Sequence, residues 1–202
     1  SVAITGSAQA DDGPCAGWRE AGLIDDLYCI SVDGGAVIAP TPKGQAYAEV
    51  LPVAFDRFAQ VFGPTEQRIA LVVQPEVSQK LASALDASGY KALPWVDSET
   101  KAAMLRDSIR EQVEAQTASL PEAQRAAVLE QALGKVGASS PATADPAIEA
   151  GAIAHEIGHL LFNSYFDSAE GASTDGPMRY GSSAPDWLDE AAAVALENEG
   201  LT

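Results

Sequence analysis

The chain has 202 residues, of which 47% are hydrophobic, and it carries a formal net charge of -17 at pH 7. Its length is sufficient for one domain with a real hydrophobic core, with or without an inserted segment. The strong negative charge argues against nucleic acids and anionic membranes as partners, because both would repel it. No run of 18 or more apolar residues is present, so the sequence predicts no transmembrane helix.

The N-terminal segment, residues 1–22, is rich in Gly, Pro and Asp and is expected to be irregular. Residues 8–10, Ala-Gln-Ala, fit the small-residue cleavage pattern at the end of a signal peptide. Cys15 and Cys29 are the only cysteines, and one close pair beside such a segment predicts a disulfide, with two free buried thiols as the alternative. We therefore expect a secreted or periplasmic protein whose single domain spans residues 23–202.

Strand signals lie in the first half of the chain. Residues 27–32 and 36–39 flank an Asp-Gly-Gly turn and predict a β-hairpin. The nearly continuous apolar run at 68–74 predicts a central strand. Residues 89–96 are expected to form an edge strand, since Pro94 is poorly tolerated in a central one. Helices are expected at residues 41–62 and 77–87.

Helical patterns dominate the second half. Two helices at residues 98–117 and 120–135 predict a helical insertion at about 98–135, followed by a small-residue linker at 134–144. Asp145 as N-cap and Pro146 as first helical residue open the next helix, which is expected to run to about residue 165. A polar loop at 163–183 and a last helix at 186–199 are expected to follow.

Both histidines of the chain fall in one five-residue string, His155-Glu156-Ile157-Gly158-His159. On a helix, positions i and i+4 lie on one face, so two imidazoles in this arrangement can bind one Zn²⁺. The intervening Glu156 can then reach a water on the metal. Two exposed surface histidines, without a metal, are the alternative reading of the same string.

The residues around this string favour the metal site. An apolar stripe at helical spacing predicts that the helix is largely buried, and a buried histidine pair needs polar partners, which a metal supplies. Gly158 costs about 1 kcal/mol relative to alanine inside a helix, so its presence indicates close approach of a backbone, a ligand or a strand. The stripe consists of Ile153, Ile157, Leu160 and Leu161.

A catalytic zinc needs three protein ligands and one open position. No third histidine exists, so a carboxylate must complete the set. The metzincin pattern would need glycine and histidine where the chain has Phe162 and Tyr165, and the aspzincin pattern would need aspartate where it has Pro177. Glu190, in the string Trp-Leu-Asp-Glu-Ala at residues 187–191, is the best candidate.

That string resembles the Trp-Leu-x-Glu-Gly/Ala segment of gluzincins, the thermolysin-like and aminopeptidase-like zinc peptidases, in which the glutamate is the third ligand. The order of elements over residues 35–96 and 147–199 is also similar to the peptidase MA-like core. The resemblance implies an α+β, zincin-like, helix-rich fold in which a small mixed sheet packs on the active-site helix. It implies a zinc-dependent metallopeptidase that hydrolyses peptide or protein substrates, with Zn²⁺ on His155, His159 and Glu190 and with Glu156 as the general base.

The chain also departs from this pattern. In thermolysin-type gluzincins, the residue four positions after the ligand glutamate is an aspartate that orients a histidine. This chain has Val194 at that position. We expect Asp186 or Asp189 to replace it. Tyr165 and Tyr180 are candidates for stabilising the oxyanion, with simple packing as the alternative role of each.

Two other functions fit the same motifs. One is an aminopeptidase of the same fold, and the other is a zinc-stabilised pseudoenzyme that acts as a binding module. For a peptidase, we expect the substrate to pair with the edge strand near residues 92–96. The sequence contains no pattern that predicts the oligomeric state.

Overall fold

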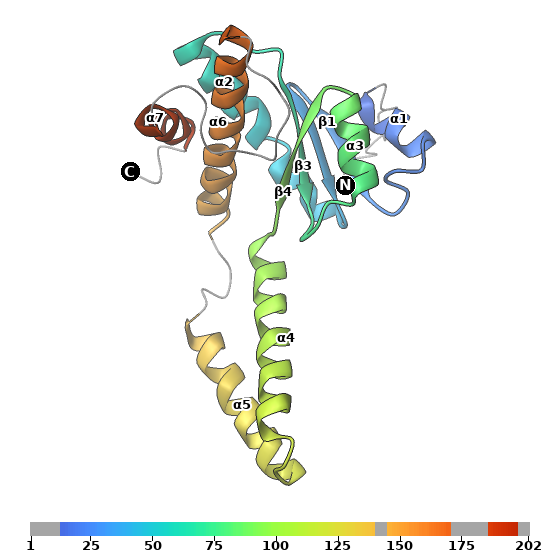
Figure 1. The fold of residues 1–202 in the computed structure, drawn as a ribbon, viewed down its shortest axis with the longest axis vertical. Coiled ribbons are helices and arrows are strands. Elements are labelled where there is room, and N and C mark those ends of the chain that lie inside the picture. The colour runs from blue at the N-terminus through green and yellow to red at the C-terminus, as the bar shows by residue number, and fades with distance from the viewer. Residues whose placement is uncertain (1–12, 140–144, 171–185, 198–202) are drawn as a thin grey trace, which may run out of the picture.

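The structure is a computed structural model that describes residues 13–139, 145–170 and 186–197. These residues form one four-stranded mixed sheet with helices on both faces (Figure 1), and the small mixed sheet of the α+β prediction is thus confirmed. In spatial order the strands are β1 (Tyr28–Val32), β2 (Gly35–Ala39), β3 (Arg68–Val73) and β4 (Tyr90–Trp95). β1 pairs antiparallel with β2, while β2, β3 and β4 run parallel, so β3 is central and β4 lies at an edge as expected.

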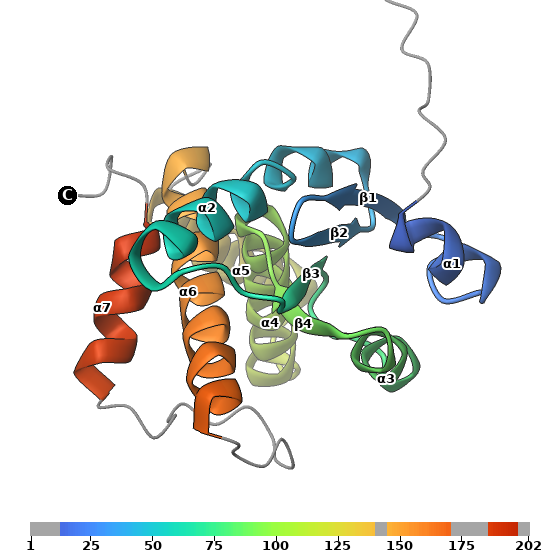
Figure 2. The same cartoon turned by 90° about the horizontal axis from the view of Figure 1, so that it is seen from above.

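Alternating side chains of the strands build two hydrophobic layers, because successive residues point to opposite faces. Val37, Leu71 and Leu93 face the layer that includes α2 and α6, whereas Ile38 and Val72 face the layer that includes α1 and α3. Figure 2 shows this division, with α2, α6 and α7 on one side of the sheet and α1 and α3 on the other. The described helices are α1 (Pro14–Glu20), η1 (Pro42–Tyr47, a 3-10 helix), α2 (Val50–Phe62), α3 (Gln79–Ala87), α4 (Ser98–Thr117), α5 (Glu122–Ser139), α6 (Pro146–Glu170) and α7 (Asp186–Leu196).

Two glycines permit the tight turn and close strand pairing at the start of β2. Gly34 has a positive φ of 80°, and a Cβ there would lie 2.8 Å from the Phe55 ring. A Cβ on Gly35 would lie 2.1 Å from the Ile69 carbonyl oxygen. The Asp-Gly-Gly turn therefore sets both the hairpin and the approach of β3.

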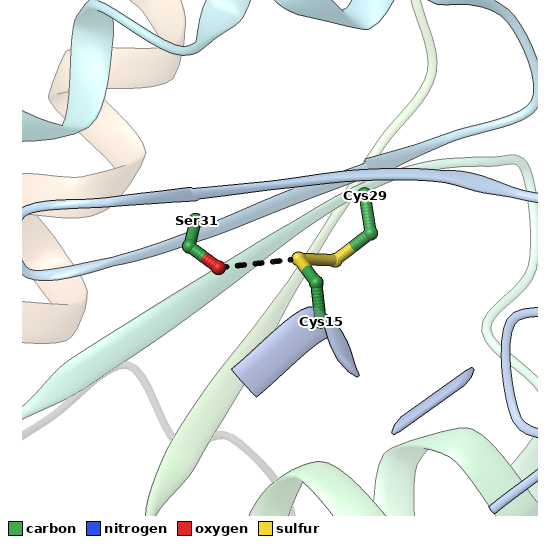
Figure 3. Close-up of a disulfide and its surroundings, with 3 residues drawn as sticks. All are labelled: Cys15, Cys29 and Ser31. Atoms are coloured by element: carbon green, nitrogen blue, oxygen red, sulfur yellow. Dashed lines mark hydrogen bonds between the residues drawn. A yellow bond between two sulfur atoms is a disulfide. The ribbon is translucent and has the colours of Figure 1, made fainter. Parts of the chain in front are cut away.

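One disulfide fastens α1 to β1. Cys15 and Cys29 are bonded with their Cα atoms 5.6 Å apart, which confirms the predicted pair, and the Ser31 hydroxyl donates to Cys15 Sγ at 3.4 Å (Figure 3). A closed loop of this size contributes about 3 kcal/mol by the chain-entropy model. The oxidised pair is consistent with an extracytoplasmic location.

Several element boundaries differ from the sequence prediction. Residues 14–20, expected to be irregular, form helix α1, because Trp18 and Cys15 are buried against the sheet. The helix expected at 41–62 is divided into η1 and α2, and Pro52 lies in the first turn of α2, where proline is tolerated. Helices α5 and α6 continue past their predicted ends, into the expected linker as far as Ser139 and into the expected polar loop as far as Glu170.

Helices α4 and α5 project from the body as a hairpin whose main contacts are between its own two helices (Figure 1). Among the hairpin side chains that the structure describes, Thr117 alone is buried. The two predicted helices are thus present, whereas their being an insertion in the domain stays a prediction. Within the described part of the chain, no helix combines the length and apolarity needed to cross a membrane.

Candidate metal centre

Helix α6 presents both histidines beside the hydrophobic core. Ile153, Ile157 and Leu161 are fully buried, as the apolar stripe predicted, while Leu160 is partly buried. Four residues separate His155 and His159, so their side chains lie one turn apart on the same face of the helix. Burial of the stripe therefore fixes the direction in which the histidine face points.

Helix α7 packs closely against this histidine face. A Cβ on Gly158 would lie 2.6 Å from the Cα of Ala193 and 3.3 Å from its nitrogen. The close approach of a backbone that was inferred from Gly158 is thus confirmed, and the partner is helix α7. The close crossing places Asp189 and Glu190 of α7 beside the imidazoles.

Three potential ligand atoms converge on one point. The Nε2 atoms of His155 and His159 are 3.1 Å apart. Glu190 places Oε2 at 3.8 Å from His155 Nε2 and Oε1 at 3.9 Å from His159 Nε2. The ligand atoms that the three side chains offer lie within 4.8 Å of one another, so the group could hold a metal ion.

The opposite nitrogen of each imidazole contacts a carboxylate. Glu197 Oε1 lies 2.7 Å from His155 Nδ1, and Asp189 Oδ1 lies 2.9 Å from His159 Nδ1. An ionised carboxylate can only accept a hydrogen bond, so a neutral imidazole in this arrangement donates from Nδ1 and presents Nε2 to a metal. The 3.1 Å between the two Nε2 atoms suits either one shared proton or a metal ion bound by both nitrogens.

The donor set fits a zinc ion. Two nitrogen ligands of a tetrahedral zinc are about 3.3 Å apart when each lies 2.0–2.1 Å from the metal, close to the observed separation of the Nε2 atoms. The Glu190 oxygens lie slightly farther from the Nε2 atoms than a shared zinc ion would require. This side chain is 62% exposed, however, and can adjust its torsions. The helices α6 and α7 carry several carboxylates and neither lysine nor arginine, so the local charge also favours a cation.

Glu156 follows His155 directly and is half-buried. A neighbouring cluster connects α6 to the edge strand: Glu149 accepts hydrogen bonds from Trp95 Nε1 and from the Ser98 amide, each at 3.1 Å. Burial, followed by the charge and hydrogen bond of Glu149, raises the pKa of Tyr47 above its usual value of 10.0. This cluster fixes the end of β4 beside the first turns of α6.

The remaining predicted site residues have different outcomes. Asp189, one of the two candidates for orienting a histidine, contacts His159. The side chain of Asp186, the other candidate, and the whole of Tyr180 lie outside what the structure describes. Tyr165 packs against the aromatic rings of Phe58 and Phe62, and it lies about 240° around the helix from His159.

Sequence reasoning missed Glu197, although a signal for it was present. Val194 occupies the position where the gluzincin pattern has aspartate, so a carboxylate that contacts His155 had to be sought at another position on the same side of the helix. Glu197 lies seven residues after Glu190, a spacing that places both on one side of a helix. A search at two-turn spacing would have found it.

Comparison with known proteins yields no family model, no curated protein and no solved structure that matches this chain.

Proposed function

We propose that the chain is a zinc-dependent metallopeptidase of gluzincin type, in which His155, His159 and Glu190 bind the metal and Glu156 is the general base. The observation that carries this proposal is the convergence of the three side chains on one point while carboxylates occupy the far nitrogens of both imidazoles. Carboxylate–histidine pairs of this kind accompany metal-ligating histidines as a rule. The resemblance to gluzincins in the two short motifs supports the same assignment.

The number of ligands among the described residues matches that of a catalytic zinc site. Structural zinc sites are closed by four protein ligands, whereas catalytic sites have three and leave one position open. The described residues supply three, and the Glu190 side chain is 62% exposed, so a substrate can approach. A stabilising zinc module would need a fourth ligand at this point.

The roles of the residues follow from their positions. When bound, the zinc ion would polarise the substrate carbonyl and make a water at its open position more acidic. Glu156 would accept a proton from the attacking water and deliver it to the leaving amine. Asp189 and Glu197 hold the two imidazoles in the tautomer that presents Nε2 to the metal.

The proposed substrate is an extended polypeptide that runs antiparallel to β4. Strand β4 is an edge of the described sheet, so its outer backbone groups face away from β3. An extended peptide can add to such an edge through backbone hydrogen bonds. The hydrogen bonds from Trp95 and Ser98 to Glu149 hold the end of this edge against the helix that carries Glu156.

The test combines zinc stoichiometry with cleavage of casein and of a peptide library. Glu156→Gln should retain zinc and lose about 100-fold or more of its cleavage rate, the usual loss for a missing general base. Glu190→Ala should lose both zinc affinity and cleavage. Glu130→Gln, an equivalent change on α5, is the matched control and should behave like the unmodified protein.

Three outcomes would contradict the proposal or replace it with an alternative. Unchanged cleavage by Glu156→Gln would refute the general-base assignment. Full zinc occupancy without cleavage of any library peptide would instead identify a zinc-binding module. Cleavage restricted to peptides with a free amino terminus would identify the aminopeptidase alternative.

A further inference from the structure

The C-terminal end of α7 is held by an arginine from a different part of the fold. Arg57, on α2, donates from Nη1 to the carbonyl oxygen of Leu196 at 3.0 Å and also to the carbonyl oxygen of Glu197. We propose that Arg57 is a positioning residue for the metal centre, which acts by holding Glu197 where its carboxylate orients His155. This inference rests on the proposed metal site and needs no assumption about peptide cleavage.

The end of a helix is a weak point that Arg57 can stabilise. The last four carbonyl groups of a helix have no partner within it, and the helix dipole places partial negative charge there. A guanidinium supplies both hydrogen bonds and positive charge. Arg57 can hold this end firmly, because its own helix is anchored in the core by the fully buried Leu51 and Phe58.

Glu197 depends on this contact because of where it lies. Helix α7 ends at Leu196, so the Glu197 backbone is already outside the regular helix, and its amide donates to the Val194 carbonyl at 3.1 Å. Its side chain must nevertheless reach His155 Nδ1, 2.7 Å away. If the last turn frays, the carboxylate moves away from the imidazole.

The other histidine provides an internal comparison. Its carboxylate partner, Asp189, lies within the regular part of α7 and is only 6% exposed. Arg57 contacts neither Asp189 nor any of the three ligands by a hydrogen bond that the structure shows. Loss of Arg57 should therefore disturb the orientation of one imidazole and leave the other in place.

The experiment measures Zn²⁺ affinity by competition with a chelator in the full chain. Arg57→Met, Glu197→Ala and the double variant are compared with Arg68→Met, the control. Arg68 also belongs to the folded body, where it stacks over the Tyr90 ring, away from the metal centre. Each of the first two variants should bind zinc about 10-fold to 100-fold more weakly, as expected when an orienting partner of a metal ligand is lost.

The double variant tests the route of the effect. If Arg57 acts through Glu197, the double variant should bind zinc no more weakly than Glu197→Ala alone, because coupled residues are not additive. Arg57→Lys retains a cation at the helix end and should restore most of the affinity. The Co²⁺-substituted protein should show an altered visible spectrum in Arg57→Met, since the geometry around the metal changes.

Each contrary result is decisive. If Arg57→Met has a lower melting temperature but a zinc affinity within about twofold of that of the unmodified protein, Arg57 has a merely structural role and the inference is overturned. Additive losses in the double variant would do the same. Should Arg57→Met fail to fold, Arg57→Gln, which also removes the cation, takes its place, and an unchanged zinc affinity and Co²⁺ spectrum in that variant would overturn the inference. If the unmodified protein binds no zinc, both proposals fail; if it binds zinc without cleaving peptides, only the proposed function fails.

Discussion

The α6–α7 pair and the α4–α5 hairpin are both pairs of helices, but different forces hold them. Helix α6 buries Ile153, Ile157 and Leu161 in the core and meets α7 at Gly158. The hairpin has one buried side chain, Thr117, among those that the structure describes. Tertiary packing thus determines the geometry of the first pair, whereas local helix propensity and a thin apolar seam maintain the second.

This difference explains where a precise site can form. Ligand atoms must be held to within a fraction of an ångström, which requires rotamers locked by packing. The α6–α7 pair provides this packing through a close backbone crossing and an arginine at its end. The described side chains of the hairpin form no equivalent framework, and its amides are expected to open locally at lower free energy.

The largest expected contrast comes from leucine truncation. Leu161→Ala on α6 removes a fully buried side chain and should lower the free energy of unfolding by about 2–5 kcal/mol. Leu129→Ala on α5 removes a half-buried side chain of the hairpin and should cost about 1 kcal/mol or less. Urea unfolding of both variants checks this, and equal losses would mean that the hairpin is packed as firmly as the site.

A second contrast compares two glycine-to-alanine substitutions that should change the stability of the protein in opposite directions. Gly158→Ala places a Cβ 2.6 Å from the Ala193 backbone and should destabilise the protein by about 1–3 kcal/mol while weakening zinc binding. Gly134→Ala on α5 meets nothing within 4 Å and should stabilise the protein by about 1 kcal/mol, because alanine favours helix. Thermal melts and zinc titration measure both effects, and a stabilising Gly158→Ala would contradict the close crossing.

The smallest effect concerns the junction at which Ser98, at the base of the hairpin, meets Glu149 of α6. Tyr47 keeps its proton in the folded protein above the pH at which it ionises when unfolded, because burial and Glu149 raise its pKa. Its contribution to stability is therefore complete below pH 10 and is lost as the pH rises further. Tyr47→Phe should reduce this alkaline loss between pH 10 and 11, compared with the control Tyr28→Phe at an exposed position.

Urea unfolding at pH 9, 10 and 11 provides the measurement for this junction. A steeper loss of stability with pH in Tyr47→Phe than in the unmodified protein would reverse the predicted sign. An effect of equal size in Tyr28→Phe would show that the junction has no special role.

Much of the fold follows from local patterns. The apolar run at residues 68–74 and the Asp-Gly-Gly turn correctly placed β3 and the β1–β2 hairpin, because continuous apolar character and turn glycines are signals contained in a few residues. The edge position of β4 followed from Pro94. The disulfide followed from a single close pair of cysteines.

The errors have a common cause. Helix α1 has little helical pattern of its own, and it forms because Trp18 and Cys15 are buried against the sheet. Helix α5 continues through two glycines that were interpreted as a linker, and α6 continues through polar residues that were interpreted as a loop. Helix ends depend on neighbouring groups, which a local pattern does not contain.

By itself, the sequence determined which residues can bind a metal: two imidazoles at helical spacing and a glutamate in a short recognisable string. Only the tertiary structure decided which groups orient them. Glu197 reaches His155 across 42 residues of chain, and Arg57 reaches the end of α7 across 139, through the packing of α2, α6 and α7. Side-chain chemistry is encoded residue by residue, whereas such distant contacts exist only after burial of the apolar faces has set how the helices cross.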